Sequence, residues 1–348
     1  MTVTFVFKYN PNHVASGENG GQFTSAPKKA AKTGVKAAVQ RDEITAALFN
    51  QKNIKATLLE KGKLFSDDSD ADWKSLGNHP DFKGTTEEEV KSKIFTRAFG
   101  KPTLSPGDVA KMIGMPDNST VKLQITIHDA DMPHIIITVV GGSIEHGIKC
   151  SREFELKKWN SSGKVLMIGD RERIVNQNVG HDYYVNASGF PRDSFKKGEY
   201  VTTVSNDILT IDRDKRSAGM GARILAHQVK YAEEYNVSTI FTMAAQGSTM
   251  NGYYTWPRLG YESQGGIPLK KVLQDEINSR SSIRSEIKSA VEKLSSTDTK
   301  ISSLMKTEEG RNLWKQFGSA LYMYFDLRKG SPQKAILAAY LAEKGIVV

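Results

Sequence analysis

The chain has 348 residues, of which 39% are hydrophobic and 25% charged, which is typical of a globular protein with a sizeable core. Its single cysteine, Cys150, excludes an intrachain disulfide and the paired thiolates of a zinc finger. The net charge is +9, and no apolar run approaches the roughly 20 residues that span a bilayer. These values predict a soluble cytoplasmic protein with no membrane partner.

The first 40 residues carry a large part of the positive charge, with five lysines against a single acid, Glu18. The stretch is rich in glycine, asparagine, lysine and alanine, and it shows turn signals with almost no periodicity. We therefore expect residues 1–40 to form a flexible basic arm. Its charge favours an anionic partner such as nucleic acid, and a solvated tail without a partner is the alternative.

Residues 41–118 are predicted to form a helical amino-terminal region. Apolar residues recur at helical spacing in 44–49 and 90–99. A threonine followed by three glutamates in 85–90 is typical of a helix start, because the hydroxyl caps the first turn and the acids favour its positive end. A cap and a short helix are also expected in 104–115.

From residue 119 onward the pattern changes to strands, which alternate with helices after residue 211. Strands are predicted at 121–129, 134–142, 152–159, 164–169, 199–211, 238–245 and 318–327. Helices are predicted at 221–235, within 251–262, in a polar insertion around 272–312, and at 335–345. Because the strands do not alternate regularly with helices, the expected fold class is α+β with a mixed sheet, in one domain over 119–348.

The stretch RSAGMGARILAHQ, residues 216–228, places two glycines between a predicted strand and a predicted helix. It lacks the lysine of a Walker A loop, and Ile224 replaces the third glycine of a dinucleotide fingerprint. Glycines let a backbone approach a ligand closely, and the free amides at a helix start favour a phosphate or pyrophosphate. A glycine turn that binds nothing is the alternative. Nearby positive charge comes from Arg213, Lys215, Arg216 and Arg223.

This stretch resembles the acetyl-coenzyme A loop of the GNAT acyltransferase superfamily, whose signature [QR]-x-x-G-x-[GA] lies between the fourth strand and the third helix. The residues that match the signature are Arg216, Gly219 and Gly221. The family continues with a strand and a short helix, often opened by asparagine and closed by a glycine–aromatic pair. Here Asn251 and the pair Gly260 and Tyr261 stand at those places. The resemblance, which covers residues 199–262 well, implies a GNAT-like mixed, mostly antiparallel central sheet flanked by helices.

The resemblance also implies a cofactor, acetyl-coenzyme A, and an amine-bearing acceptor that attacks its acyl group directly. Loop amides would hold the pyrophosphate, and the pantetheine arm would lie between two splayed strands. A backbone amide near residues 209–211 would polarise the acyl carbonyl, where negative charge develops. The implied cofactor contacts are Ile211, Asp212, Arg213, Arg216, Ser217, Ala218, Gly219, Met220, Gly221, Ala222 and Asn251.

The sequence departs from the family at the usual catalytic acid. Many members carry a tyrosine four residues before the closing glycine, and its hydroxyl protonates the leaving thiolate. Trp256 stands there instead, with Pro257 after it to kink or shorten the helix. Tyr254 and its neighbour Tyr253 are therefore the candidate catalytic residues, with packing against the sheet as the alternative role. Candidate bases are Asp207, Asp212, His181 and His227, and no metal site is expected because the histidines lack ligand spacing.

The arm has a resemblance of its own, to a short pattern near the ends of tailed-phage head-associated proteins. The residues that carry it are His13, Gly20, Gly21, Gln22, Phe23 and Thr24. It implies a phage-encoded protein that acts in the host cytoplasm or is associated with the virion. Three functions are then open: an active N-acetyltransferase, a catalytically inactive GNAT-fold virion or binding component, and a nucleic-acid-binding protein. The Trp256–Pro257 pair favours the second, and the absence of a helix-turn-helix, RRM or zinc pattern weighs against the third.

Overall fold

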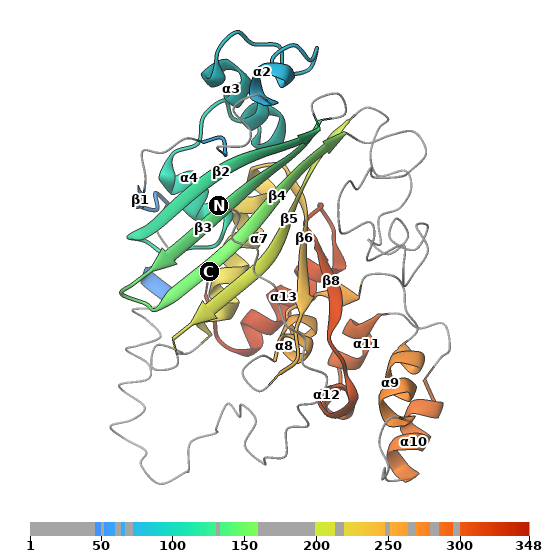
Figure 1. The fold of residues 1–348 in the computed structure, drawn as a ribbon. Coiled ribbons are helices and arrows are strands. Elements are labelled where there is room, and N and C mark those ends of the chain that lie inside the picture. Colours follow the sequence, from blue (N-terminus) through green and yellow to red (C-terminus); the bar gives the residue numbers. More distant parts are fainter. Residues whose placement is uncertain are drawn as a thin grey trace.

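The structure is a computed structural model in which a single sheet forms the centre of the protein (Figure 1). It describes residues 46–49, 52–59, 64–66, 72–129, 133–158, 199–212, 219–247, 251–263, 269–278, 285–294 and 300–347. The described residues form one eight-stranded sheet and ten helices, which makes the fold α+β as predicted. The arm at 1–40 and the predicted strand at 164–169 lie outside the described residues.

The strands follow the predicted pattern from residue 119 onward. They are β1 (Ala56–Leu58), β2 (Ser119–Asp129), β3 (His134–Ser143), β4 (Ile148–Lys158), β5 (Tyr200–Ile211), β6 (Val237–Ala244), β7 (Glu262–Ser263) and β8 (Leu321–Asp326). Their order in the sheet is β1-β2-β3-β4-β5-β6-β8-β7. Only the β1–β2 and β5–β6 pairs of these eight strands are parallel. The prediction of a mixed, mostly antiparallel sheet flanked by helices is therefore confirmed.

The described residues also form ten helices. They are α2 (Asp72–Leu76), α3 (Glu87–Phe99), α4 (Pro106–Met112), α7 (Met220–Glu234), α8 (Gly252–Arg258), α9 (Leu269–Asn278), α10 (Ser285–Glu292), α11 (Ile301–Met305), α12 (Glu308–Phe317) and α13 (Pro332–Glu343). Thr86 caps α3 by accepting a hydrogen bond from the Glu89 amide, as the threonine–glutamate pattern predicted. The strand β1 was not predicted, because three residues are too few to show a period and their partner β2 lies far along the chain.

One face of the sheet is covered by helices of both halves of the chain. In Figure 1 the sheet faces the viewer and α4 and α7 lie behind β2 to β5. On that covered face Phe154 of β4 packs its ring 5.4 Å from the ring of Phe99 in α3, and Cys150 lies against Met115 just after α4. The buried apolar side chains form one continuous core from Phe49 to Leu337. The region before residue 119 thus contributes directly to the core beneath the sheet.

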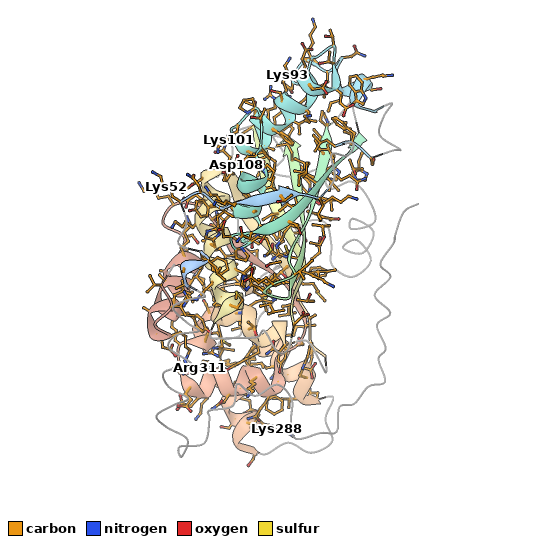
Figure 2. All side chains as sticks on the ribbon, turned by 90° about the vertical axis from the view of Figure 1, so that its left-hand side faces the viewer. Lys52, Lys93, Lys101, Asp108, Lys288 and Arg311 are labelled. Atoms are coloured by element: carbon orange, nitrogen blue, oxygen red, sulfur yellow. The ribbon has the colours of Figure 1, made fainter. Side chains whose placement is uncertain are left out.

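A polar cluster ties α4 to the carboxyl end of α7. Ser105 and Asp108 form a capping box at the start of α4, and the Tyr235 hydroxyl donates a hydrogen bond to the Asp108 carboxylate. Lys101 lies 3.1 Å from the same carboxylate, and Figure 2 shows the two labelled side chains close together. Partial burial alone would raise the pKa of Asp108. Hydrogen bonds from Tyr235, Ser105 and Lys101 outweigh it and lower that pKa to about 2.

Replacing Asp108 by alanine removes the cap and the contact with α7. We expect the free energy of unfolding at pH 7 to fall by about 1–2 kcal/mol, the usual cost of such a cap and its hydrogen bonds. The pKa of the carboxyl is lower in the folded protein than its ordinary 3.8, so its stabilisation is present above pH 3.8 and is lost as the pH falls through about 2. Urea unfolding at pH 7 and pH 3 should therefore show the difference between variant and parent becoming smaller in acid.

The exposed Glu88, in the first turn of α3, provides the matched control. Glu88→Ala also removes an acid near a helix start but breaks no cap, so it should cost less than about 0.5 kcal/mol. An Asp108→Ala loss as small as that of Glu88→Ala would show that the cluster does not hold α4 to α7.

Candidate functional site

The parallel strands β5 and β6 separate partway along their length. They pair from Thr202 opposite Val237 to Asn206 opposite Thr242. Beyond that point β5 continues to Ile211 paired only with β4, and β6 continues to Ala244 paired only with β8. Among the described residues, the sheet pairing therefore leaves the facing edges of these two strand ends without each other as partners, and the Met243 carbonyl on the β6 edge accepts a hydrogen bond from the Ala245 amide at 2.9 Å instead. Backbone groups outside a sheet pairing need another partner, which can be the protein itself, water or a ligand.

A β-bulge explains why the strands separate at this place. Across the β4–β5 pair Arg152 lies opposite Asn206, but the next residue, Ser151, lies opposite Ile208, so Asp207 is an extra residue in β5. A bulge bends its strand and increases the local twist. Asp207 directly follows the last residue that pairs with β6, so the bend begins where the pairing ends.

The helix that connects the two strands begins beside this separation. Gly219 precedes α7 with φ 79° and ψ 14°, a left-handed conformation that favours glycine. A Cβ at this residue would also lie 2.4 Å from the Cδ1 atom of Ile346. No side chain of the described residues caps α7, and uncapped first-turn amides at the positive end of a helix dipole are the kind of group that binds an anion.

Gly221 differs from Gly219, although the two look alike in the sequence. It lies within the first turn of α7, and outside the helix itself the nearest described atom to a Cβ built on it is the Cδ1 of Ile211, at 4.0 Å. The absence of a side chain therefore leaves open space next to the helix start. The contact also shows that the end of β5 and the start of α7 lie against each other.

The structure brings together most of the predicted cofactor residues that it describes. Ile211 and Asp212 end β5, where the Asp212 amide donates to the Gly147 carbonyl at 2.9 Å. Met220 and Ala222, buried in the first turn of α7, offer backbone rather than side chains to this site. Four predicted contacts lie outside the described residues: Arg213, Arg216, Ser217 and Ala218.

Asn251 lies where β6 leads into α8. It forms an isolated bridge with Gln246, beyond the end of β6, and its Oδ1 accepts a hydrogen bond from the Thr255 hydroxyl at 3.1 Å. The helix that follows ends at Arg258, one residue after Pro257, as the proline predicted. The exposed Asn251 side chain is thus held on the β6 side of the strand separation.

The two candidate tyrosines have different surroundings. The Tyr253 hydroxyl donates a hydrogen bond to the Lys315 carbonyl of α12 at 2.8 Å, and the Trp314 indole donates to the Tyr253 carbonyl at 2.7 Å. Tyr253 therefore joins α8 to α12. Tyr254 packs its ring under Arg258, whose guanidinium carbon lies 5.4 Å from the ring centroid. Its hydroxyl makes no hydrogen bond to the described residues, so its proton is the more available one.

Of the candidate bases, the structure places Asp207 at the bulge. It is exposed, and its carboxylate accepts a hydrogen bond from the Ser205 hydroxyl at 2.6 Å. His227 is instead fully buried in α7, with its ring 5.4 Å from that of Phe49 and 4.6 Å from that of Tyr231. A weakly basic ring sealed in the core is no general base. His181 lies outside the described residues.

The sequence analysis missed a buried polar group directly beneath the strand separation. Asn206 and Gln228 of α7 exchange two side-chain hydrogen bonds of 2.9 Å, and the Asn206 amide lies 3.5 Å from the Tyr261 hydroxyl. Arg152 lies opposite Asn206 in β4 and is itself fully buried. The sequence did hold a signal for this group. Asn206 in β5 and Arg152 in β4 are polar residues at inward-facing strand positions, where the alternation calls for an apolar residue.

Comparisons with known proteins add no relative: no protein-family model, curated protein or solved structure matches the chain. The described residues contain no group of three or more histidines, cysteines and acids suited to a metal ion. None of the helices they form combines the length and apolar character that crossing a membrane requires.

The burial of His227 predicts an acid-sensitive fold. Burial, together with the positive charges of Lys230 and Lys111, lowers the pKa of His227 to about 3 from an ordinary 6.5. On acidification His227 is protonated in the unfolded chain at a higher pH than in the folded protein. The free energy of unfolding therefore falls as the pH drops below 6.5, by about 1.4 kcal/mol per pH unit from this group. His227→Phe should remove that part of the slope between pH 7.5 and 4.5 in urea unfolding.

The phenyl ring of this variant keeps the contacts with Phe49 and Tyr231 and cannot titrate. Phe49→Leu changes the same ring contact but no titratable group, so it serves as the control and should leave the slope unchanged. An unaltered pH slope in His227→Phe would mean that this histidine is not buried in its neutral form.

Proposed function

We propose that the chain is an N-acyltransferase of the GNAT type, which transfers the acetyl group of acetyl-coenzyme A to an amine. One observation carries the proposal. Two parallel strands separate beyond a bulge, and the helix joining them starts at the left-handed Gly219 beside the separated ends. This combination would place a helix start suited to an anion beside strand edges that have left the sheet pairing, as the family resemblance of residues 199–262 implies.

Each part of the cofactor has a matching part in this arrangement. The amides at the start of α7 would hold the pyrophosphate, helped by the positive end of the helix dipole. Strand-edge groups of β5 before Ile211, and of β6 opposite them, would pair with the amide groups of the pantetheine arm, and Asn251 would bond it from the β6 side. A β5 amide at residues 209–211 would donate to the acyl oxygen, where negative charge grows as the amine attacks.

The remaining chemistry is the movement of protons. In a direct transfer the amine nitrogen bonds to the acyl carbon, the carbon–sulfur bond breaks, and the thiolate leaves. Asp207, exposed at the bulge, would accept the proton that the amine loses. Tyr254, whose hydroxyl has no described partner, would give a proton to the thiolate. The acceptor is an amine of a protein or of a small molecule.

A second candidate function is a GNAT-like component without catalysis, and two observations favour it. Trp256 occupies the place of the usual acid with its ring 5.2 Å from that of Tyr261, and the hydroxyl of the nearby Tyr253 is engaged with α12. Such a protein would bind acetyl-coenzyme A without consuming it. Proposed association with a virion or with nucleic acid rests on the sequence of the arm, residues 1–40, which lies outside the described residues.

A substitution at Gly221 gives the most specific test of cofactor binding. Gly219 is a poor probe, because any side chain there would strain the backbone and collide with Ile346. Gly221→Asp has room for its side chain and places a carboxylate beside the proposed pyrophosphate. A like charge at about 4 Å costs roughly 4 kcal/mol near a protein surface, so acetyl-coenzyme A should bind at least about 100-fold more weakly in calorimetry.

Gly221→Ala provides the matched control, because it adds a Cβ without charge. Its affinity for acetyl-coenzyme A should stay within about three-fold of the parent, and the helix should gain up to about 1 kcal/mol. Equal affinities of the aspartate and alanine variants would show that no anion sits at the start of α7.

The tyrosines distinguish the active from the inactive form. Thiol release from acetyl-coenzyme A in the presence of a cell extract measures transfer to an acceptor that is not yet identified. Tyr254→Phe should slow this release about 100-fold without changing the affinity for acetyl-coenzyme A, because it removes only the proton donor. Tyr253→Phe should change the rate less than about three-fold. Cofactor binding by the parent without thiol release in any extract would favour the inactive component.

A further inference from the structure

A buried arginine lies at the bulge of β5. Arg152 of β4 is only 1% exposed, and its Nη1 atom donates hydrogen bonds to the Ser151 carbonyl at 3.0 Å and the Ile208 carbonyl at 2.7 Å. Ile208 directly follows Asp207, the extra residue of the bulge. The guanidinium thus joins β4 to the residue of β5 that directly follows the bulge.

The charge of Arg152 makes this placement unusual for a strand interior. No carboxylate in the described part of the chain forms an ion pair with it, and its Nε atom is buried without a described hydrogen-bond partner. Burying a cation without a counter-charge is costly, so a position that only fills the core would favour an apolar side chain. The residue is better explained by what its donors do at the bulge.

The neighbours of Arg152 hold Asn206, the residue on the other side of the bulge. Across the strand pair lies Asn206, whose two hydrogen bonds with Gln228 anchor it to α7. The Tyr261 hydroxyl lies 3.5 Å from the Asn206 amide. Burial raises the pKa of Tyr261 while the positive charge of Arg152 acts against it, which agrees with the closeness of the two groups. Asn206 is thereby held in pairing with β6, and Ile208 is held away from it.

We propose that Arg152 is a positioning residue that fixes the bulge at Asp207 and so sets the direction of residues 208–211. A guanidinium is rigid and planar and presents several donors, so it can hold two carbonyls at once in a fixed geometry. The effect of this positioning on a bound acyl group rests on the proposed function, because the amide that would contact the acyl oxygen lies among residues 208–211.

The first test follows the backbone and needs no ligand. Hydrogen exchange of the amides of residues 208–211, read by mass spectrometry on the full chain, should be at least ten-fold faster in Arg152→Met than in the parent. Arg152→Lys keeps a donor and should recover part of the protection. Phe154→Leu is the matched control, because Phe154 is buried two residues along the same strand and contacts α3 instead of the bulge.

Faster exchange of residues 208–211 in Arg152→Met, but not in Phe154→Leu, is the expected result. An equal increase in both variants would mean that Arg152 acts only through general stability and would overturn the inference. So would an unchanged exchange rate in Arg152→Met. Because the measurement uses no cofactor, it decides the role of Arg152 even when coenzyme A binds to no variant, an outcome that would refute the proposed function alone.

The second test asks whether the bulge positions the acyl contact. Calorimetry would compare coenzyme A with acetonyl-coenzyme A, an unreactive analogue that carries a ketone oxygen near the place of the acyl oxygen. The parent should bind the ketone about ten-fold more tightly than coenzyme A, and Arg152→Met should lose this preference while its affinity for coenzyme A stays within about three-fold. A preserved preference would show that Arg152 does not orient the β5 amide.

Discussion

The departure of β5 from β6 is the constraint on which the candidate site depends. The two strands pair up to Asn206 and Thr242, and each then keeps only its outer neighbour, β4 or β8. The sheet therefore gives up one row of hydrogen bonds without losing either strand. The backbone groups that no longer pair across the two strands keep the spacing of an extended backbone. A ligand that carries amide groups of its own would therefore be a suitable partner for them.

The rest of the molecule holds this separation in place. At its carboxyl end α7 is joined to α4 through Tyr235 and Asp108, and at its amino end Gly219 lies against Ile346. Between these ends Gln228 bonds Asn206 of β5. The first turn of α7 is thus fixed relative to the end of β5, which an anion site and an acyl contact acting on one ligand would both require.

Residues that look alike in this sequence have different structural roles. Gly219 is required by its left-handed backbone and by the closeness of Ile346, whereas Gly221 is helical and leaves space beside Ile211. The neighbours Tyr253 and Tyr254 likewise differ, because only Tyr253 uses its hydroxyl to bind α12. The sequence shows two glycines and two tyrosines, and the surroundings of each residue decide which of them can take part in chemistry.

The sequence by itself determined the succession of strands and helices from residue 119 onward, the two glycines at the start of α7, and the short helix that ends one residue after Pro257. These features follow from local periodicity, turn residues and the geometry of proline, which neighbouring residues fix. Only the tertiary structure decided the pairing of β1, the bulge at Asp207, the burial of His227 and the meeting of Arg152 with Asn206. Each of these depends on strand register and on packing between segments far apart in the chain, and no local pattern records either.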